Sequence, residues 1–371
     1  MNILIFNWRD PKHSWAGGGE IYIFEQARRW VKMGHAVTVF CSQDYYKTLP
    51  FNEKVDGITI YRKGNRFSVY LWAIWYYLIH FRGSFDVVID VVNGIPFFTP
   101  LYCRLPKICY IYHVHGKQFF YELPKILSSI GYFIERFIFP FYYKNIPIVA
   151  ISETTKQQLI QIGFKKKDVT IIYCGINRSI KSSKKLIKKY INPTVLYLGR
   201  IKKYKRVDML VNIFPLIVKR VPRARLVIAG WGTDASFITE LIMLNPLKRK
   251  ISLLGPVSEK EKKDLLSKAW LFVNPSIGEG WSIAVIEANL YGTPAIAFNV
   301  PGVSESIKTN KTGLLAKNQE DLVEKICSLL LDKKIYAMYS ANASKWAKKF
   351  DWDTAARQSI KMIAQIYHEK K

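Results

Sequence analysis

The segment with the most chemical content covers residues 274–288 and contains two glutamates and two glycines. An apolar strand is predicted over 269–273, and after the second glycine of the segment an apolar helix begins. The free backbone N–H groups at a helix start attract anions. Glu279 lies in the turn, and Glu287 lies roughly two helical turns further on, since a helix turns every ~3.6 residues. This arrangement suits a nucleotide-sugar, whose diphosphate would lie between two carboxylates that accept hydroxyl groups. The residues expected at the helix start are Gly280, Trp281 and Ser282.

Two basic residues follow the first predicted strand of the second half of the chain. Arg200 comes directly after the strand 193–199, and Lys205 precedes the next helix. A guanidinium can bind a phosphate through two hydrogen bonds, and a lysine adds a point charge. The next strand, 224–229, runs into a G-x-G loop formed by Gly230 and Gly232. Surface charge and solvated glutamates would be an alternative explanation for each of these features taken singly.

The N-terminal half opens with a strand–helix–strand pattern, which is typical of a doubly wound sheet. Gly17 and Gly18 precede its first helix, predicted over 21–33, and allow close approach of a bound group. The dinucleotide fingerprint G-x-G-x-x-G is absent, which disfavours a dehydrogenase. His113 and His115 follow a further strand, and at i and i+2 of an extended segment their side chains are expected on opposite faces.

Taken in order, these segments resemble the retaining glycosyltransferases of the GT4 family. The resemblance rests on the E-x7-E pattern, the glycine loop GGGE, the His115-Gly116 pair, the G-R-x4-K element and the later G-x-G loop. One segment departs from the family pattern, because Cys174-Gly175-Ile176-Asn177 stands where P-N-G-[VI]-D is usual.

The resemblance implies a nucleoside-diphosphate sugar donor, a saccharide or lipid-linked acceptor and transfer with retention of configuration. It implies no metal and no cofactor, and no Asp-x-Asp metal pattern follows a predicted strand. The residues that it makes catalytic are Glu279, His115 and Glu287. The residues that it assigns to donor binding are Gly17, Gly18, Arg200, Lys205, Gly230, Gly232, Gly280, Trp281, Ser282 and Glu287.

A chain of 371 residues is expected to form two domains. The fold class implied is α/β of the GT-B type, with two Rossmann-like domains whose parallel sheets face an inter-domain cleft. We expect an acceptor-binding domain over 1–178, a basic linker over 179–192 and a nucleotide-sugar-binding domain over 193–351. The C-terminal helix, 352–371, is expected to pack back on the first domain.

The composition is strongly basic, with 56 Lys and Arg against 28 Asp and Glu and a net charge of +28. Such a charge attracts polyanions without choosing among them. The segment 118–143 combines many aromatic residues with interleaved basic ones, which favours contact with an anionic membrane surface, although a core helix would be an alternative. The apolar run 67–81 is too short to span a bilayer. A non-catalytic polyanion- or membrane-binding protein, and a sugar-phosphate synthase or phosphorylase of similar fold, stay open as alternatives.

Five cysteines without C-x-x-C spacing suggest neither a zinc site nor a disulfide framework. A reducing compartment fits best, and the N-terminus begins with an apolar strand and lacks the pattern of a signal peptide. The expected location is therefore cytoplasmic, peripheral on the cytoplasmic face of a membrane, with no specific nucleic-acid partner.

Overall fold

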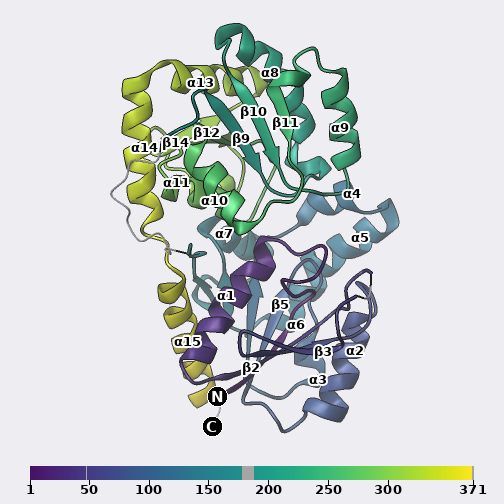
Figure 1. Ribbon diagram of the computed structural model, residues 1–371. Coiled ribbons are helices and arrows are strands. Elements are labelled where there is room, and N and C mark those ends of the chain that lie inside the picture. Colours follow the sequence, from purple (N-terminus) through teal and green to yellow (C-terminus); the bar gives the residue numbers. More distant parts are fainter. Residues whose placement is uncertain (47, 178–187, 370–371) are drawn as a thin grey trace. The chain divides into compact units, whose positions relative to one another are not determined.

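The structure, a computed structural model, describes residues 1–46, 48–177 and 188–369. The chain divides into two compact units (Figure 1). The first unit combines Met1–Gly175 with Trp352–Lys371, and the second is Ile176–Asp351. Ile176 forms an isolated parallel bridge with Asp351, which ties both ends of the second unit together. The linker predicted over 179–192 falls largely outside the described residues.

The first unit contains an eight-stranded sheet in the order β3-β4-β2-β1-β5-β6-β7-β8. All neighbouring strands are parallel except β3 and β4, which pair antiparallel. The central strands are buried on both faces, which explains their continuous apolar sequences. The strands are β1 (Asn2–Phe6), β2 (Ala36–Cys41), β3 (Asn52–Val55), β4 (Ile58–Arg62), β5 (Val87–Val92), β6 (Lys107–Ile111), β7 (Ile148–Ala150) and β8 (Val169–Ile171).

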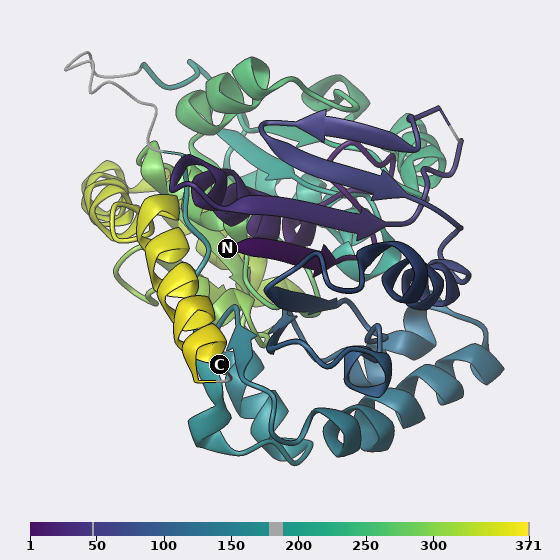
Figure 2. The same ribbon diagram turned by 90° about the horizontal axis from the view of Figure 1, so that it is seen from below.

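The helices of the first unit include one from the far end of the chain. Helix α15 packs against α1 (Figure 2). In this contact the Trp30 indole N–H donates to the Ala356 carbonyl at 3.1 Å and lies 3.2 Å from Ser359 Oγ. The helices are α1 (Gly18–Lys32), α2 (Val69–Tyr76) with the π-turn η1 (Tyr77–Phe81), α3 (Thr99–Tyr102), η2 (Gly116–Gln118), α4 (Phe119–Glu122), α5 (Lys125–Phe133), η3 (Ile134–Ile138), α6 (Phe139–Tyr143), α7 (Glu153–Gln161), η4 (Lys166–Asp168) and α15 (Trp352–His368).

The second unit contains a six-stranded, wholly parallel sheet in the order β11-β10-β9-β12-β13-β14. Side chains alternate between two cores: Val195 and Val273 pack on one face, and Leu196 and Phe272 on the other. The strands are β9 (Thr194–Leu198), β10 (Arg225–Ala229), β11 (Ile251–Leu253), β12 (Leu271–Asn274), β13 (Ala295–Phe298) and β14 (Gly313–Ala316).

Helices connect these parallel strands, as crossover connections must. A capping box of Ser258 and Glu261 begins α10. The helices are η5 (Lys203–Lys205), α8 (Val207–Arg220), α9 (Ala235–Leu244), η6 (Lys248–Lys250), α10 (Glu259–Lys268), α11 (Ile283–Leu290), α12 (Val303–Ser306), α13 (Gln319–Leu331) and α14 (Lys333–Ala347). The predicted α/β class, with two sheets of mostly parallel strands, is confirmed.

The helices can also be compared with what a bilayer requires. Within the described ranges, none combines the length and apolar character needed to cross a membrane. The apolar run 67–81, predicted as a helix within a domain, forms α2 and η1.

Candidate functional site

Loops that follow the parallel strands of the second unit pack closely on one another. Gly230 has a φ of +135°, and a Cβ built on it would lie 1.9 Å from the Gly199 carbonyl oxygen. A Cβ on Gly232 would lie 2.0 Å from the Ile201 carbonyl oxygen. Only glycine permits this contact, so the G-x-G loop has a packing role: it lets the loop that carries Arg200 lie directly beside it.

Arg200 is held by two tyrosines, Tyr197 of strand β9 and Tyr204 of η5. The Tyr197 hydroxyl donates to the Arg200 carbonyl oxygen at 2.6 Å, and the Arg200 guanidinium donates to the Tyr204 hydroxyl at 3.3 Å. The backbone N–H of Ile277 donates to the Tyr204 carbonyl at 3.0 Å. The turn that contains Arg200 and Lys205 is therefore attached to the segment 274–282.

Glu279 is the centre of the hydrogen-bond network in that segment. Its Oε1 atom lies 2.9 Å from Lys205 Nζ and accepts hydrogen bonds from Asn274 Nδ2 at 2.7 Å and Ser276 Oγ at 2.9 Å. Burial by itself raises the pKa of Glu279, but the Lys205 ammonium and the hydrogen bonds from Asn274 and Ser276 outweigh it and hold the pKa below its ordinary value. The carboxylate is thus ionised at neutral pH beside a cation.

The start of helix α11 lies directly after this network. Its N-cap residue, Ser282, accepts a hydrogen bond from Asn274 Nδ2 at 3.0 Å, and no side chain of the described residues caps the helix there. Asn274 therefore holds both Glu279 and Ser282 in place. The Trp281 ring packs 5.3 Å from the Phe350 ring, in the interior of the unit. The N–H groups in the first turn of a helix have no partner within the helix, and such groups can bind an anion.

A neighbouring loop sets the backbone position of Glu279, and the sequence analysis missed it. The Glu279 N–H donates to the Pro301 carbonyl at 3.3 Å. Gly302 has a φ of +79°, and a Cβ built on it would lie 1.7 Å from the Glu279 carbonyl oxygen. The loop after β13 therefore packs against the backbone of the turn that follows β12 and fixes the position of Glu279.

Glu287, on helix α11, pairs with a different lysine. Lys262 Nζ of helix α10 lies 2.9 Å from Glu287 Oε1 and also 2.9 Å from Glu259 Oε1. Burial raises the pKa of Glu287 above its ordinary value, although Lys262 acts in the opposite direction. Lys262 was not predicted as a site residue from the sequence, because its partner is 25 residues away.

The glycine loop of the first unit is closed by a buried carboxylate. The Gly17 N–H donates to Glu20 Oε2 at 2.7 Å, and Glu20 Oε1 lies 3.0 Å from a guanidinium nitrogen of Arg9. Gly18 is the first residue of α1. The Gly17 amide therefore already has an acceptor within the chain. A Cβ on Gly19 would lie 2.7 Å from the Tyr112 ring, so the third glycine lets α1 approach the end of β6.

The prediction that His113 and His115 lie on opposite faces is wrong. Their ring centroids lie 4.0 Å apart, because the strand β6 ends at Ile111 and His115 has helical dihedral angles. Glu135, a buried residue that the sequence analysis also missed, accepts the His115 N–H at 2.7 Å and the Gly116 N–H at 2.6 Å. The histidine segment is thus held from π-turn η3 by one carboxylate.

The structure places the predicted site residues in two groups. Arg200, Lys205, the two loop glycines, the α11 start and both glutamates belong to the second unit, whereas Gly17, Gly18 and His115 belong to the first. Within the second unit, Lys205, Glu279 and the α11 start are joined by direct contacts. Glu287 forms a separate pair with Lys262.

Comparison with known proteins shows the class to which such a fold and site belong. The family model for Glycosyltransferase Family 4 matches residues 16–179, and the model for glycosyl transferases group 1 matches residues 178–346. The chain is therefore a glycosyltransferase. It belongs to the GT4-type family and has the GT-B fold.

Individual relatives are distant but cover nearly the whole chain. The gpi3 subunit of the phosphatidylinositol N-acetylglucosaminyltransferase of Schizosaccharomyces pombe is 20% identical over 95% of this chain and 78% of its own. A sucrose-phosphate synthase from Thermosynechococcus elongatus superposes with a TM-score of 0.82 at 19% identity, covering 99% of both chains. HepE from Anabaena, solved with UDP-glucose, superposes with a TM-score of 0.75 at 15% identity, covering 98% of this chain and 100% of its own.

Proposed function

We propose that this glycosyltransferase moves a hexose from a nucleoside-diphosphate sugar to a saccharide or lipid-linked acceptor, with retention of configuration and without a metal. The observation that carries the proposal is the cluster of Lys205, Glu279 and the uncapped start of α11 in one unit. A cation beside free amides is suited to a diphosphate.

In this mechanism the acceptor hydroxyl attacks the anomeric carbon from the face that the diphosphate leaves, which retains the configuration. The oxygen–carbon bond forms as the bond from that carbon to the diphosphate breaks, and the hydroxyl proton passes to the departing diphosphate. Negative charge then collects on the departing diphosphate. Lys205, Arg200 and the first amides of α11 stabilise that charge, and fixed donors act most strongly where charge develops in the transition state. Glu279 positions hydroxyl groups of the donor sugar, and Glu287 accepts from the ribose.

Two relatives support the substrate classes. HepE was solved with UDP-glucose, and the S. pombe relative is named for transfer of N-acetylglucosamine to phosphatidylinositol. We therefore propose a UDP-sugar as the first donor to test and a lipid-linked acceptor.

A thermal-shift screen of the intact chain with UDP-, GDP- and ADP-sugars tests donor binding. A donor at about 100 times its Kd adds about 2.7 kcal/mol of stability, which corresponds to a rise in Tm of about 5–10 °C. Arg200→Ala is expected to weaken binding about tenfold or more, since it removes a charged contact with the diphosphate. Arg220→Ala, on the exposed end of α8, is the matched control and should bind as the wild type does. No shift with any of the three donors would contradict the proposal.

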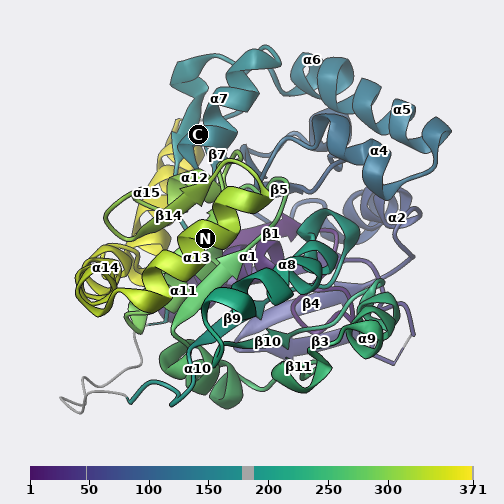
Figure 3. The same ribbon diagram turned by 90° about the horizontal axis from the view of Figure 1, so that it is seen from above.

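An anionic membrane is the second partner that we propose, and its support is a surface of the first unit. Helices α4, α5 and α6 follow one another along one side of that unit (Figure 3). The segment of α4, α5, η3 and α6 exposes large apolar side chains. Its most exposed members are Tyr121, Ile126, Phe133, Phe137 and Phe141, with exposed fractions between 53% and 76%. Lys117, Lys125 and Lys144 are exposed on the same segment. Exposed apolar side chains with exposed lysines on the same segment suit the interface of an anionic bilayer. With all five cysteines free and buried, we place this contact on the cytoplasmic face.

Flotation with vesicles that contain phosphatidylserine tests the membrane proposal. We expect the wild type to float with these vesicles, and the charge-reversal variant K117E/K125E/K144E to lose at least about 3 kcal/mol of binding, because each lysine near the surface contributes about 1 kcal/mol. The control K165E/K166E/K167E reverses three exposed lysines elsewhere in the first unit and should float nearly as well. Equal losses in both variants would instead indicate the alternative of general polyanion attraction by the +28 charge.

A further inference from the structure

The first unit contains a cavity that the proposed catalytic groups do not use. Its volume is about 830 Å³, in the size range of small-molecule sites. Trp8 follows β1, Asp44 follows β2, and Lys63 follows β4, so the cavity opens at the carboxyl ends of three neighbouring parallel strands. Ligand sites of α/β sheets form at such ends.

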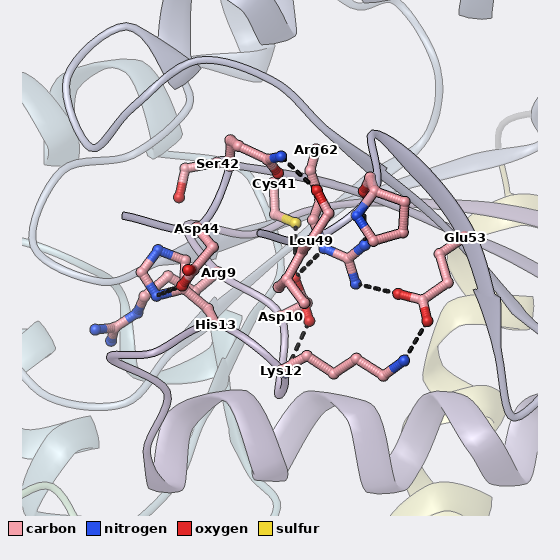
Figure 4. Close-up of polar contacts among 12 residues, drawn as sticks. Arg9, Asp10, Lys12, His13, Cys41, Ser42, Asp44, Leu49, Glu53 and Arg62 are labelled. Carbon is pink, nitrogen blue, oxygen red and sulfur yellow. Dashed lines mark hydrogen bonds and ion pairs between the residues drawn. The ribbon is translucent and has the colours of Figure 1, made fainter. Parts of the chain in front are cut away.

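Arg62 lines the cavity, and its charge is balanced by neighbouring carboxylates. The fully buried Arg62 guanidinium binds Asp10 at 2.7 Å, Glu53 at 2.8 Å and the Pro50 carbonyl at 2.9 Å, and Lys12 pairs with Glu53 (Figure 4). Two cations thus face two carboxylates. Each of the three guanidinium nitrogens of Arg62 donates to an acceptor within the chain, so Arg62 holds the strand ends together, and Asp10 and Glu53 balance the charges of Arg62 and Lys12.

One wall of the cavity is built from two stacked rings. Asp44 accepts the backbone N–H groups of Ser14 at 2.7 Å and Tyr46 at 3.2 Å, which fixes two loops side by side. The rings of Trp15 and Tyr45 then stack at 5.3 Å with an interplanar angle of 22°. Phe51 and Phe67 also line the cavity.

Two cations that line the cavity, Lys63 and Arg66, have no carboxylate partner among the described residues. Lys63 Nζ lies 5.5 Å from the centroid of the Phe51 ring, and the Arg66 guanidinium lies 4.6 Å from that of Phe67. Neither forms an ion pair with a carboxylate anywhere in the described part of the chain. Among the described residues that line the cavity, Asp44 is the one acid. Both of its oxygens accept backbone amides, and Oδ1 also lies 3.7 Å from Nδ1 of His13, another lining residue. The cavity is therefore aromatic and positively charged.

We propose that this cavity binds an anionic carbohydrate, with a sugar or cyclitol ring against the aromatic walls and a phosphate or carboxylate on Lys63 and Arg66. Aromatic faces are negative and pack against the C–H faces of a saturated ring, and a guanidinium with a lysine matches an oxyanion. This inference rests on the proposed function in one respect: in a glycosyltransferase such a ligand is the charged part of the acceptor.

Isothermal titration of the full chain with D-glucose 6-phosphate, D-glucuronate and D-glucose tests the site. We expect the two charged sugars to bind with Kd values of about 1 mM or below, and D-glucose about tenfold more weakly. The variant K63A/R66A should reduce affinity for the charged sugars to that for D-glucose. Trp15→Ala should weaken all three, because it removes a ring that every sugar contacts. The control K165A/K167A removes the same charge outside the cavity and should change nothing.

The same titrations distinguish a phosphate ligand from a carboxylate ligand. They also test the cavity independently of the proposed glycosyltransferase function. A preference for the phosphate over the carboxylate identifies a sugar phosphate, and the reverse preference a sugar acid. The inference is overturned if the wild type binds neither charged sugar, if it binds them no better than D-glucose, or if K63A/R66A binds as the wild type does. UDP titrated into the same variants reports the donor site of the second unit. Binding of charged sugars without any donor binding would defeat the proposed function and leave this inference standing.

Discussion

Replacement of Lys205 by alanine is expected to reduce kcat about 10²–10³-fold, the usual cost of removing one donor that stabilises developing oxyanion charge. Lys205 Nζ lies 2.9 Å from Glu279 Oε1, next to the start of α11. The departing diphosphate would lose its lysine while Arg200 and the helix amides stay in place. Steady-state kinetics with the donor identified by the thermal-shift screen measures the effect.

Lys205→Ala has a second consequence that must be separated from the first. It leaves Glu279 as a partly buried carboxylate without its cation, which raises the pKa of Glu279 and destabilises the unit by several kcal/mol at most. Glu279→Gln removes the carboxylate charge with little change of shape, so the double variant K205A/E279Q should regain most of the lost stability. If Lys205 acts on the donor, the double variant stays about 10²-fold slower than E279Q alone. Equal rates of these two variants would reduce Lys205 to a structural partner of Glu279.

Predictions from the sequence succeeded where the chemistry is local. The strand before Asn274, the turn and the helix after Ser282 follow directly from an apolar run, two glycines and a second apolar run. In each parallel strand, the sequence also changes from apolar to polar residues at the carboxyl end. The loops that hold Arg200 and Lys205 could therefore be placed at strand ends from the sequence.

Predictions failed where a contact joins distant residues. Glu135 holds the His115 segment from 20 residues away, and Lys262 reaches Glu287 across 25 residues. No periodicity links such partners. The two histidines were misplaced for a local reason, since a helical turn replaced the expected extended segment.

One element was missed although its signal was present. Strands β3 and β4 form a hairpin around Asp56 and Gly57, whose φ angles are +51° and +84°. An Asp-Gly pair is among the strongest hairpin signals, because both residues tolerate positive φ. Strand β3 was not predicted because its sequence is polar, and a strand at the edge of a sheet needs few apolar residues.

Gly302 is the position at which a single methyl group should do most harm to the donor site. A Cβ there would lie 1.7 Å from the carbonyl oxygen of Glu279, and the φ of +79° is unfavourable for any residue with a side chain. Backbone must move, because the contact is with main-chain atoms. We expect Gly302→Ala to destabilise the unit by about 2–4 kcal/mol, a fall in Tm of about 5–15 °C, and to shift Glu279 away from Lys205 and Asn274.

A second glycine separates the steric cost from the conformational one. Gly255 has a similar φ, +69°, but a Cβ built there would meet no atom within 4 Å. Gly255→Ala should therefore lower the free energy of unfolding by only about 1 kcal/mol, because the left-handed backbone is its only unfavourable term. The variant should keep the donor affinity of the wild type. Gly302→Ala should lose donor affinity even at temperatures where circular dichroism reports a folded chain. If both variants bind the donor equally well, the Pro301–Gly302 loop does not support Glu279, and the donor site depends on β12 and α11 alone.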